Sequence, residues 1–148
     1  MNSKIIIING PNINLLGERE QSQYGSITFE KLKEDCLAKS KELGLYIEFA
    51  QSNVEGELVN IIQNARDKFD GMIINAAAFT HTSIAIRDAL EIFKKPIIEV
   101  HISNIYKREE FRKKSLISDV VTGGIFGLSA NGYILAIISM QKLIQNEN

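Results

Sequence analysis

Residues that commonly hold metals or carry redox chemistry are scarce in this chain of 148 residues, which contains one cysteine and two histidines. The single cysteine, Cys36, excludes a disulfide within the chain. It falls among apolar positions of a predicted helix, where we interpret it as a small core residue. The histidines and the cysteine do not have the spacing of metal ligands. The composition therefore predicts neither a metal site nor a metal cofactor.

Long apolar segments and a strong charge of one sign are also missing. The run of four isoleucines at 5–8 is far too short to span a membrane, and the N-terminus has no charged-then-apolar export signal. A formal net charge of −1 gives no general attraction to nucleic acid or to an anionic membrane. We therefore expect a cytoplasmic protein that binds neither. A basic cluster within 107–114 is interrupted by Glu109 and Glu110, and we interpret it as a solvated helix face.

Patterns that cradle phosphate are absent as well. No G-x-G-x-x-G follows the first apolar run, and there is no G-x-x-x-x-G-K-[ST]. The predicted strand ends also lack the acidic cluster of a receiver domain. These absences argue against nucleotide binding and phosphorelay, and we expect no organic cofactor.

Short apolar runs alternate with amphipathic helical stretches along the whole chain, which fits a single domain over 1–148. Such runs are typical of parallel strands that are covered on both faces. The expected strands are 4–8, 46–50, 72–75, 97–101 and 120–122. The expected helices are 28–43, 55–69, a helix between 83 and 95, 105–114 and 130–144.

Five strand–helix units with short connections and right-handed crossovers predict a flavodoxin-like three-layer α/β sandwich. Its five-stranded parallel sheet would have the strand order 2-1-3-4-5. In that order the carboxyl ends of strands 1, 3 and 4 are neighbours, and ligands bind at such ends. The segments 9–25, 75–88 and 101–112 should therefore converge on one site.

The first of these segments is far longer than the roughly two to six residues of an ordinary loop between strand and helix. It carries Arg19 and Tyr24, five residues apart. A cation held close to a phenol favours the phenolate, which is a usable base. The alternative is that Arg19 is a solvated charge and Tyr24 packs on the edge of the sheet.

The second segment crowds polar groups at a predicted helix start: Asn75, His81 and the hydroxyls of Thr80, Thr82 and Ser83. Free backbone N–H groups and the helix dipole there suit an anionic or hydroxyl-rich ligand. The alternative is that Thr82 or Ser83 is only an N-cap and His81 is exposed.

The third segment begins with Glu99 and His101, which lie on one face of the fourth predicted strand. A carboxylate beside an imidazole fixes its tautomer and favours the protonated ring, which suits a general acid near neutral pH. The alternative is that His101 is a structural residue.

Four motifs in these segments, GPNINLLGERE…YG, N…THTSIAIRDAL, EVHISN and REEFRKKS, resemble the type II 3-dehydroquinate dehydratases in order and spacing. The resemblance covers essentially the whole chain. It implies an enzyme of the shikimate pathway that removes water from 3-dehydroquinate to give 3-dehydroshikimate through an enolate. It implies no Schiff base and no metal.

The resemblance implies five catalytic residues. Tyr24 matches the base that removes a proton from C2 as tyrosinate, and Arg19 matches the residue that keeps it ionisable. Asn12 matches the residue that holds a water against the enolate oxygen. His101 matches the acid that protonates the departing C1 hydroxyl, with Glu99 as its orienter.

The resemblance also implies the substrate contacts and an assembly. Asp88 matches a residue that reaches the site of an adjoining subunit, and the implied assembly is a homododecamer, a tetramer of trimers. The ring-hydroxyl contacts would be Asn75, His81 and Arg112, and the carboxylate would be held by Ile102 and Ser103.

Two positions depart from the family pattern. Ala76 and Ala77 follow Asn75 where Pro-Gly is usual, and alanine rarely adopts a positive φ as glycine does. Gln21 replaces a frequent proline, which should make this loop less rigid. The competing hypothesis is a non-catalytic flavodoxin-like module that binds a small anion or a protein partner.

Overall fold

The run of four isoleucines forms the centre of the first strand, and its residues face alternately into two separate cores. Ile5 and Ile7 pack into one buried cluster, and Ile6 and Ile8 pack into the other. Successive side chains of a strand point to opposite faces of a sheet, so this alternation covers the strand on both faces.

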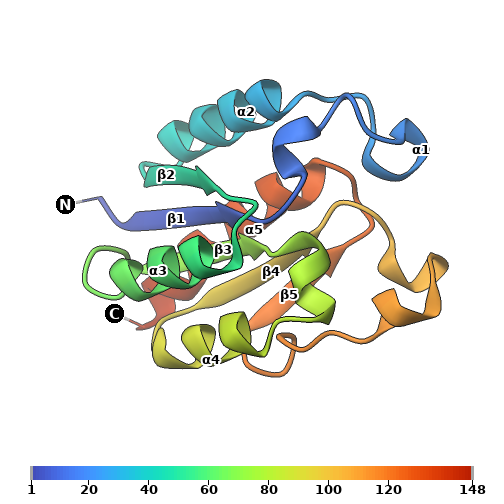
Figure 1. The fold of residues 1–148 in the computed structure, drawn as a ribbon. Coiled ribbons are helices and arrows are strands. Elements are labelled where there is room, and N and C mark those ends of the chain that lie inside the picture. The colour runs from blue at the N-terminus through green and yellow to red at the C-terminus, as the bar shows by residue number, and fades with distance from the viewer. Residues whose placement is uncertain (1, 148) are drawn as a thin grey trace.

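The structure is a computed structural model that describes residues 2–147. All five strands of its sheet are parallel, in the order β2-β1-β3-β4-β5 (Figure 1). The predicted order 2-1-3-4-5 is therefore confirmed. The strands are β1 (Lys4–Asn9), β2 (Tyr46–Gln51), β3 (Gly71–Asn75), β4 (Ile97–His101) and β5 (Gly123–Phe126).

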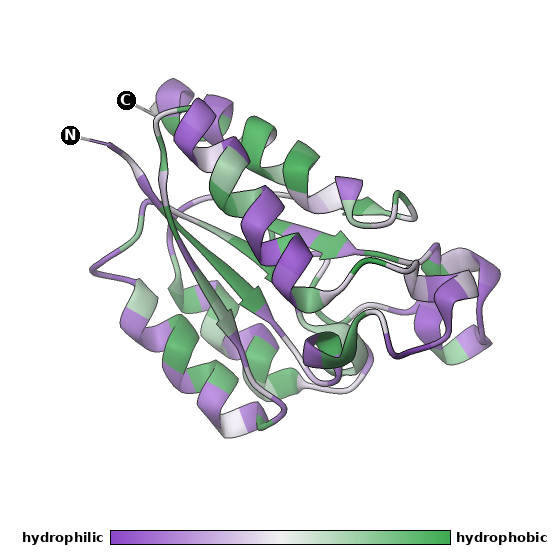
Figure 2. Cartoon of the chain, turned by 90° about the horizontal axis from the view of Figure 1, so that it is seen from above, coloured by the Kyte–Doolittle hydropathy of each residue, from purple (hydrophilic) through white to green (hydrophobic). Residues whose placement is uncertain are grey.

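Two pairs of helices complete the three layers. α2 (Phe29–Glu42) and α5 (Asn131–Glu147) contribute to one core, and α3 (Glu55–Ala65) and α4 (Ile84–Ile92) contribute to the other. Figure 2 shows the mostly hydrophobic strands between helices that turn hydrophilic residues outward. The described residues contain no helix long and apolar enough to cross a membrane.

Side-chain caps fix the starts of two of these helices. The Thr28 hydroxyl accepts from the Lys31 N–H (3.1 Å), and the Ser83 hydroxyl accepts from the Ile86 N–H (2.9 Å). The N-cap of α4 is therefore Ser83 rather than Thr82. α3 ends at Ala65, before the predicted end at 69.

The fifth strand lies later than predicted, at Gly123–Phe126 instead of 120–122. The Val120 N–H closes a turn onto the Ile117 carbonyl (3.0 Å), so this apolar run is not extended. The pairing with β4 begins at Gly123, which is opposite Ile98. Glycines usually weaken a strand, and for that reason the sequence pattern placed the strand before them.

The predicted helix over 105–114 is also wrong. Two short 3-10 helices, η3 (Ile105–Lys107) and η4 (Glu110–Lys113), occupy this stretch. They are separated by extended backbone at Arg108 (φ −107°, ψ −162°) and by Glu109 (φ −59°, ψ 149°). The break turns the side chain of Arg108 inward, away from the solvated helix face that the charge pattern had predicted.

Candidate active site

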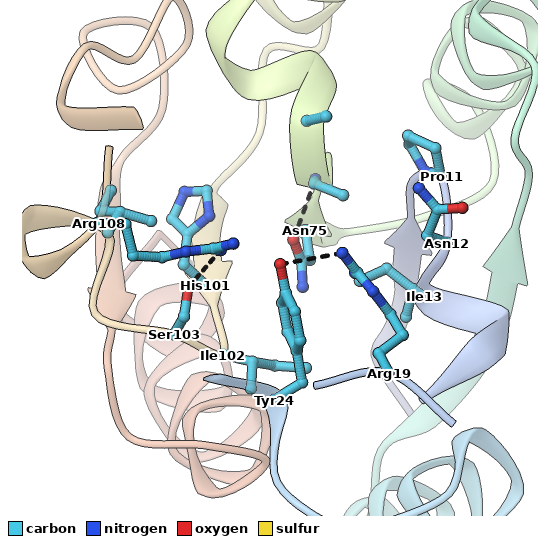
Figure 3. Close-up of a pocket in the computed structure, with 13 residues that line it drawn as sticks. Pro11, Asn12, Ile13, Arg19, Tyr24, Asn75, His101, Ile102, Ser103 and Arg108 are labelled. Atoms are coloured by element: carbon cyan, nitrogen blue, oxygen red, sulfur yellow. Dashed lines mark hydrogen bonds between the residues drawn. The ribbon is translucent and has the colours of Figure 1, made fainter. Parts of the chain in front are cut away.

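One pocket opens at the carboxyl ends of β1, β3 and β4, and all three predicted segments contribute to it (Figure 3). The strand order explains this convergence, because these three strands are neighbours in the sheet. The polar residues that line the pocket are Asn12, Arg19, Tyr24, Asn75, His101, Ser103 and Arg108.

Arg19 and Tyr24 meet inside this pocket. The Arg19 Nη2 donates a 3.0 Å hydrogen bond to the Tyr24 hydroxyl, and its guanidinium carbon lies 3.8 Å from the centre of the Tyr24 ring. Tyr24 belongs to a single helical turn, α1 (Gln21–Tyr24), and is only 6% exposed. The structure thus holds a buried phenol against a fixed cation, and Arg19 is not a free surface charge.

A second arginine, Arg108, enters the same pocket from the break between η3 and η4. Its guanidinium carbon lies 5.1 Å from the centre of the Tyr24 ring, and its Nη1 donates to the Ser103 hydroxyl (3.1 Å). Its Nε is buried without a hydrogen-bond partner among the described residues. The charge pattern had assigned Arg108 to solvent, although it is the first residue of the motif REEFRKKS.

Glu99 and His101 form a buried pair at the end of β4. Their side chains are 4% and 8% exposed, and His101 Nε2 lies 2.5 Å from Glu99 Oε2. The hydroxyls of Ser118 and Ser115 donate to the same carboxylate at 2.6 Å and 3.3 Å. The two serines belong to the loop between η4 and β5. No pattern in the sequence indicates that this loop contacts Glu99, so these two hydrogen bonds were not predicted.

These contacts determine the charge of Glu99. Burial alone would raise the pKa of its carboxyl, but the hydrogen bond and charge of His101, together with the two serine hydroxyls, outweigh burial and lower this pKa below its usual range. Glu99 is therefore a carboxylate at neutral pH. It engages Nε2 of His101, which leaves Nδ1 as the ring nitrogen available to a ligand.

Asn75 sits at the end of β3 in a buried polar chain that sequence reasoning did not find. Its Nδ2 donates to the Tyr133 hydroxyl (2.9 Å), which donates to Asn9 Oδ1 (2.7 Å). Its Oδ1 accepts from the Ala77 N–H (3.1 Å). Ala77 has a φ of 53°, so this alanine adopts a left-handed conformation that glycine takes more readily.

His81 ends η2 (Ala77–His81) and lies beside His101, with ring centres 6.3 Å apart and ring planes at 25°. Its Nδ1 donates to the Lys114 carbonyl (2.7 Å), so Nε2 carries the free lone pair. Partial burial, aided by the charges of His101 and Arg112, lowers the pKa of His81. His81 is therefore a neutral imidazole at neutral pH.

A family model described as "Dehydroquinase class II" matches residues 3–141. The chain belongs to the class II dehydroquinase family. It is 53% identical to a 3-dehydroquinate dehydratase of Prochlorococcus marinus, over 90% of this chain and 92% of that protein. It is 48% identical to a 3-dehydroquinate dehydratase of Campylobacter lari, over 98% and 91%.

Solved structures of class II dehydroquinases have the same fold. The type II dehydroquinase from Butyrivibrio crossotus matches with a TM-score of 0.93 and 44% identity, over 95% of this chain and 98% of that one. The type II dehydroquinase from Propionibacterium acnes matches with a TM-score of 0.93 and 43% identity, over 96% and 98%.

Four residues that the resemblance to the dehydroquinases implied do not line this pocket: Glu99, His81, Arg112 and Asp88. The Arg112 Nε donates to Glu109 (3.1 Å), and its guanidinium lies 5.3 Å from the centre of the Phe111 ring. Asp88 is exposed on α4, beside a separate hollow that Arg87 and Tyr106 also line. Ile102 and Ser103 line the pocket itself.

Proposed function

We propose that this class II dehydroquinase removes water from 3-dehydroquinate to give 3-dehydroshikimate, a step of the shikimate pathway, through an enolate. One observation carries the proposal: a buried phenol held by a cation and a buried imidazole held by a carboxylate line the same pocket. The first pair suits a base and the second suits an acid. The similarity to the 3-dehydroquinate dehydratases of Prochlorococcus marinus and Campylobacter lari supports this substrate.

Tyr24 acts as the base in this proposal. As tyrosinate it removes a proton from C2, beside the C3 ketone. The C–H electron pair forms a C2=C3 double bond, and the π pair of the ketone moves onto its oxygen. The Arg19 guanidinium, 3.0 Å from the hydroxyl, stabilises the charge of the tyrosinate. Asn12 holds a water that donates a hydrogen bond to the enolate oxygen, which stabilises the charge where it develops.

His101 acts as the acid in the second half of the reaction. The enolate re-forms the C3 ketone and its C2=C3 electron pair forms a C1=C2 double bond. The C1–O bond breaks, and the protonated His101 delivers its Nδ1 proton so that the hydroxyl leaves as water. The Glu99 carboxylate stabilises the imidazolium before this transfer. The proton on Tyr24 then returns to solvent and His101 is protonated again.

The charge of the pocket suits the carboxylate of the substrate. Two guanidiniums, of Arg19 and Arg108, line it, and the buried Arg108 Nε has an N–H to offer. We assign the carboxylate to the backbone N–H groups of Ile102 and Ser103 and to the Ser103 hydroxyl, with Arg108 beside it. The ring hydroxyls are assigned to Asn75 in the pocket, to His81 beside His101, and to Arg112, which would have to leave Glu109 to reach the ligand.

The direct test is to mix the protein with 3-dehydroquinate and follow the conjugated enone absorbance of 3-dehydroshikimate. We expect turnover, and we expect that borohydride added with the substrate leaves the enzyme active, because the enolate route forms no imine. A lysine adduct found by mass spectrometry would contradict the mechanism. Binding of 3-dehydroquinate without turnover would instead support the non-catalytic anion-binding module.

A further inference from the structure

Asn12 has an unusual backbone for a residue that carries a side chain. Its φ is 70° and its ψ is −3°, which is the left-handed region. Asparagine tolerates this region better than most residues with a side chain, but the region is still less favourable than the right-handed one, so a contact can decide whether it is adopted. The direction of the Asn12 side chain, and hence the water that we assign to it, depends on what holds this conformation.

A side chain from the loop after β2 supplies this support. The Asn53 Oδ1 accepts a 2.9 Å hydrogen bond from the backbone N–H of Asn12. The two residues are 41 positions apart, and the parallel pairing of β1 with β2 brings them together. Asn9 is opposite Gln51, and the Ser52 N–H donates to the Asn9 carbonyl (3.1 Å), so the loop after β2 runs beside the loop after β1.

Gln51 fixes Asn53 in turn. Its Nε2 lies 3.1 Å from Asn53 Oδ1, 3.2 Å from the Gly10 carbonyl and 3.3 Å from Asn14 Oδ1. The Gln51 amide thus connects Asn53 with Gly10 and Asn14, which lie two positions before and two positions after Asn12. The Asn53 side chain does not line the pocket, so it can act on a ligand only through another residue, and Asn12 is the pocket residue that it contacts.

We propose that Asn53 is a positioning residue that sets the orientation of Asn12, with Gln51 as its support. The inference rests on the proposed function, because Asn12 matters there as the residue that holds the water at the enolate oxygen. Both hydrogen bonds of Asn53 end on its Oδ1. An aspartate can therefore replace it, whereas an alanine cannot.

The test compares Asn53→Ala, Asn53→Asp and the control Asn60→Ala, which changes an exposed asparagine of α3 outside this cluster. A hydrogen bond that solvent can reach is worth a factor of about three to ten. We expect Asn53→Ala to lower kcat by about this factor while KM changes less than about twofold. Asn53→Asp and Asn60→Ala should keep wild-type kcat.

A double-mutant cycle shows whether Asn53 acts through Asn12. Asn12→Ala is measured with and without Asn53→Ala, and the second change should have no further effect on kcat in that background. An equal loss in both backgrounds would overturn the proposal, because Asn53 would then act by another route. Full activity of Asn12→Ala would overturn it too, because Asn12 would have no catalytic role to support.

Hydrogen exchange tests the same contact without any turnover. The Asn12 amide should exchange faster in Asn53→Ala than in the wild type and should stay protected in Asn53→Asp. Unchanged exchange in Asn53→Ala would overturn the positioning role whatever the enzyme catalyses. A protein that shows the exchange effect but no turnover of 3-dehydroquinate would instead contradict the proposed function alone.

Discussion

Glu99 and His101 form a hydrogen-bonded pair of 2.5 Å that is almost completely shielded from solvent. The carboxylate uses both oxygens, because Ser118 donates to Oε1 while Ser115 and His101 contact Oε2. A buried carboxylate whose oxygens all accept hydrogen bonds is held rigidly, and it holds its partner rigidly in turn. His101 is thus held by a group that does not itself line the main pocket.

Low pH should lower the folding stability of the protein by protonating Glu99. The folded-state pKa of Glu99 is lowered, so its contribution to stability is present above the unfolded pKa of about 4.3 and is lost as the pH falls through the lower folded value. We expect the free energy of unfolding to fall below about pH 5, and less steeply in Glu99→Gln. Chemical denaturation at several pH values measures this, and an equal slope in both proteins would contradict it.

Removal of the Tyr24 hydroxyl should nearly abolish turnover and preserve binding. In Tyr24→Phe the ring still fills its buried site, but the base is gone, and general-base catalysis contributes about 10²–10⁴-fold. We expect kcat to fall by about this factor while the affinity for a ligand changes little. Tyr46→Phe, at a half-exposed tyrosine on the edge strand β2, is the control. A Tyr24→Phe enzyme that keeps about a tenth of wild-type kcat would exclude Tyr24 as the sole base.

The Tyr133 hydroxyl should stabilise the fold because it is buried and joins two buried amide groups. It links Asn9 and Asn75, and its burial raises the pKa of the phenol. Tyr133→Phe leaves two buried amide groups without their partner, which costs about 1–3 kcal/mol. We expect that loss in urea denaturation. A change of less than about 0.5 kcal/mol, the size of a neutral surface substitution, would show that the amides find other partners.

Ala77 carries backbone strain that a glycine would remove. Its φ of 53° is unfavourable by about 1–2 kcal/mol for a residue with a Cβ, and the added entropy of an unfolded glycine offsets about 0.4–1 kcal/mol. Ala77→Gly should therefore stabilise the protein by roughly 0.5–1 kcal/mol. Ala38→Gly, at an exposed position of α2, should destabilise it by about 1 kcal/mol. The same sign for both variants in thermal denaturation would contradict the strain.

The sequence indicated the sheet because periodic burial leaves a clear pattern. The unbroken run of isoleucines in β1 is what a strand covered on both faces requires. Glu99 and His101 are two residues apart in β4, so both side chains lie on one face of that strand. Contacts made by irregular backbone leave no such pattern. Arg108 turns inward only because the helix expected around it is broken, and β5 begins at two glycines that signal a turn in most sequences.

The loops that complete the site were therefore the least predictable part. Ser115 and Ser118 reach Glu99 from 16 and 19 residues away, and Asn53 reaches Asn12 from 41. No local spacing encodes such contacts. The contact of Asn53 with Asn12 follows from the strand order, which brings the loops after neighbouring strands to the same edge of the sheet, and the two serines reach Glu99 because the connection after β4 folds back onto that strand.

Asp88 supplies the last prediction, which concerns the assembly. It is exposed on α4, and the neighbouring Arg87 pairs with Asp119 and Glu91 instead of with Asp88. Asp88 also lies outside the pocket of its own chain. If it serves the site of an adjoining subunit, as the resemblance implies for a homododecamer built as a tetramer of trimers, Asp88→Ala should lower activity although its own pocket keeps every residue.

Mixed oligomers show whether Asp88 serves the site of its own subunit or that of an adjoining one. Asp88→Ala co-expressed with Tyr24→Phe should regain part of the lost activity, because some sites then combine an intact Tyr24 of one chain with an intact Asp88 of another. Tyr24→Phe co-expressed with His101→Ala is the matched control, and it should regain none, because both residues line the pocket of one chain. Full activity of Asp88→Ala alone would make Asp88 a surface residue. Loss of activity without recovery in the mixture would place Asp88 in the site of its own subunit, and the proposed contribution across the subunit boundary would be wrong.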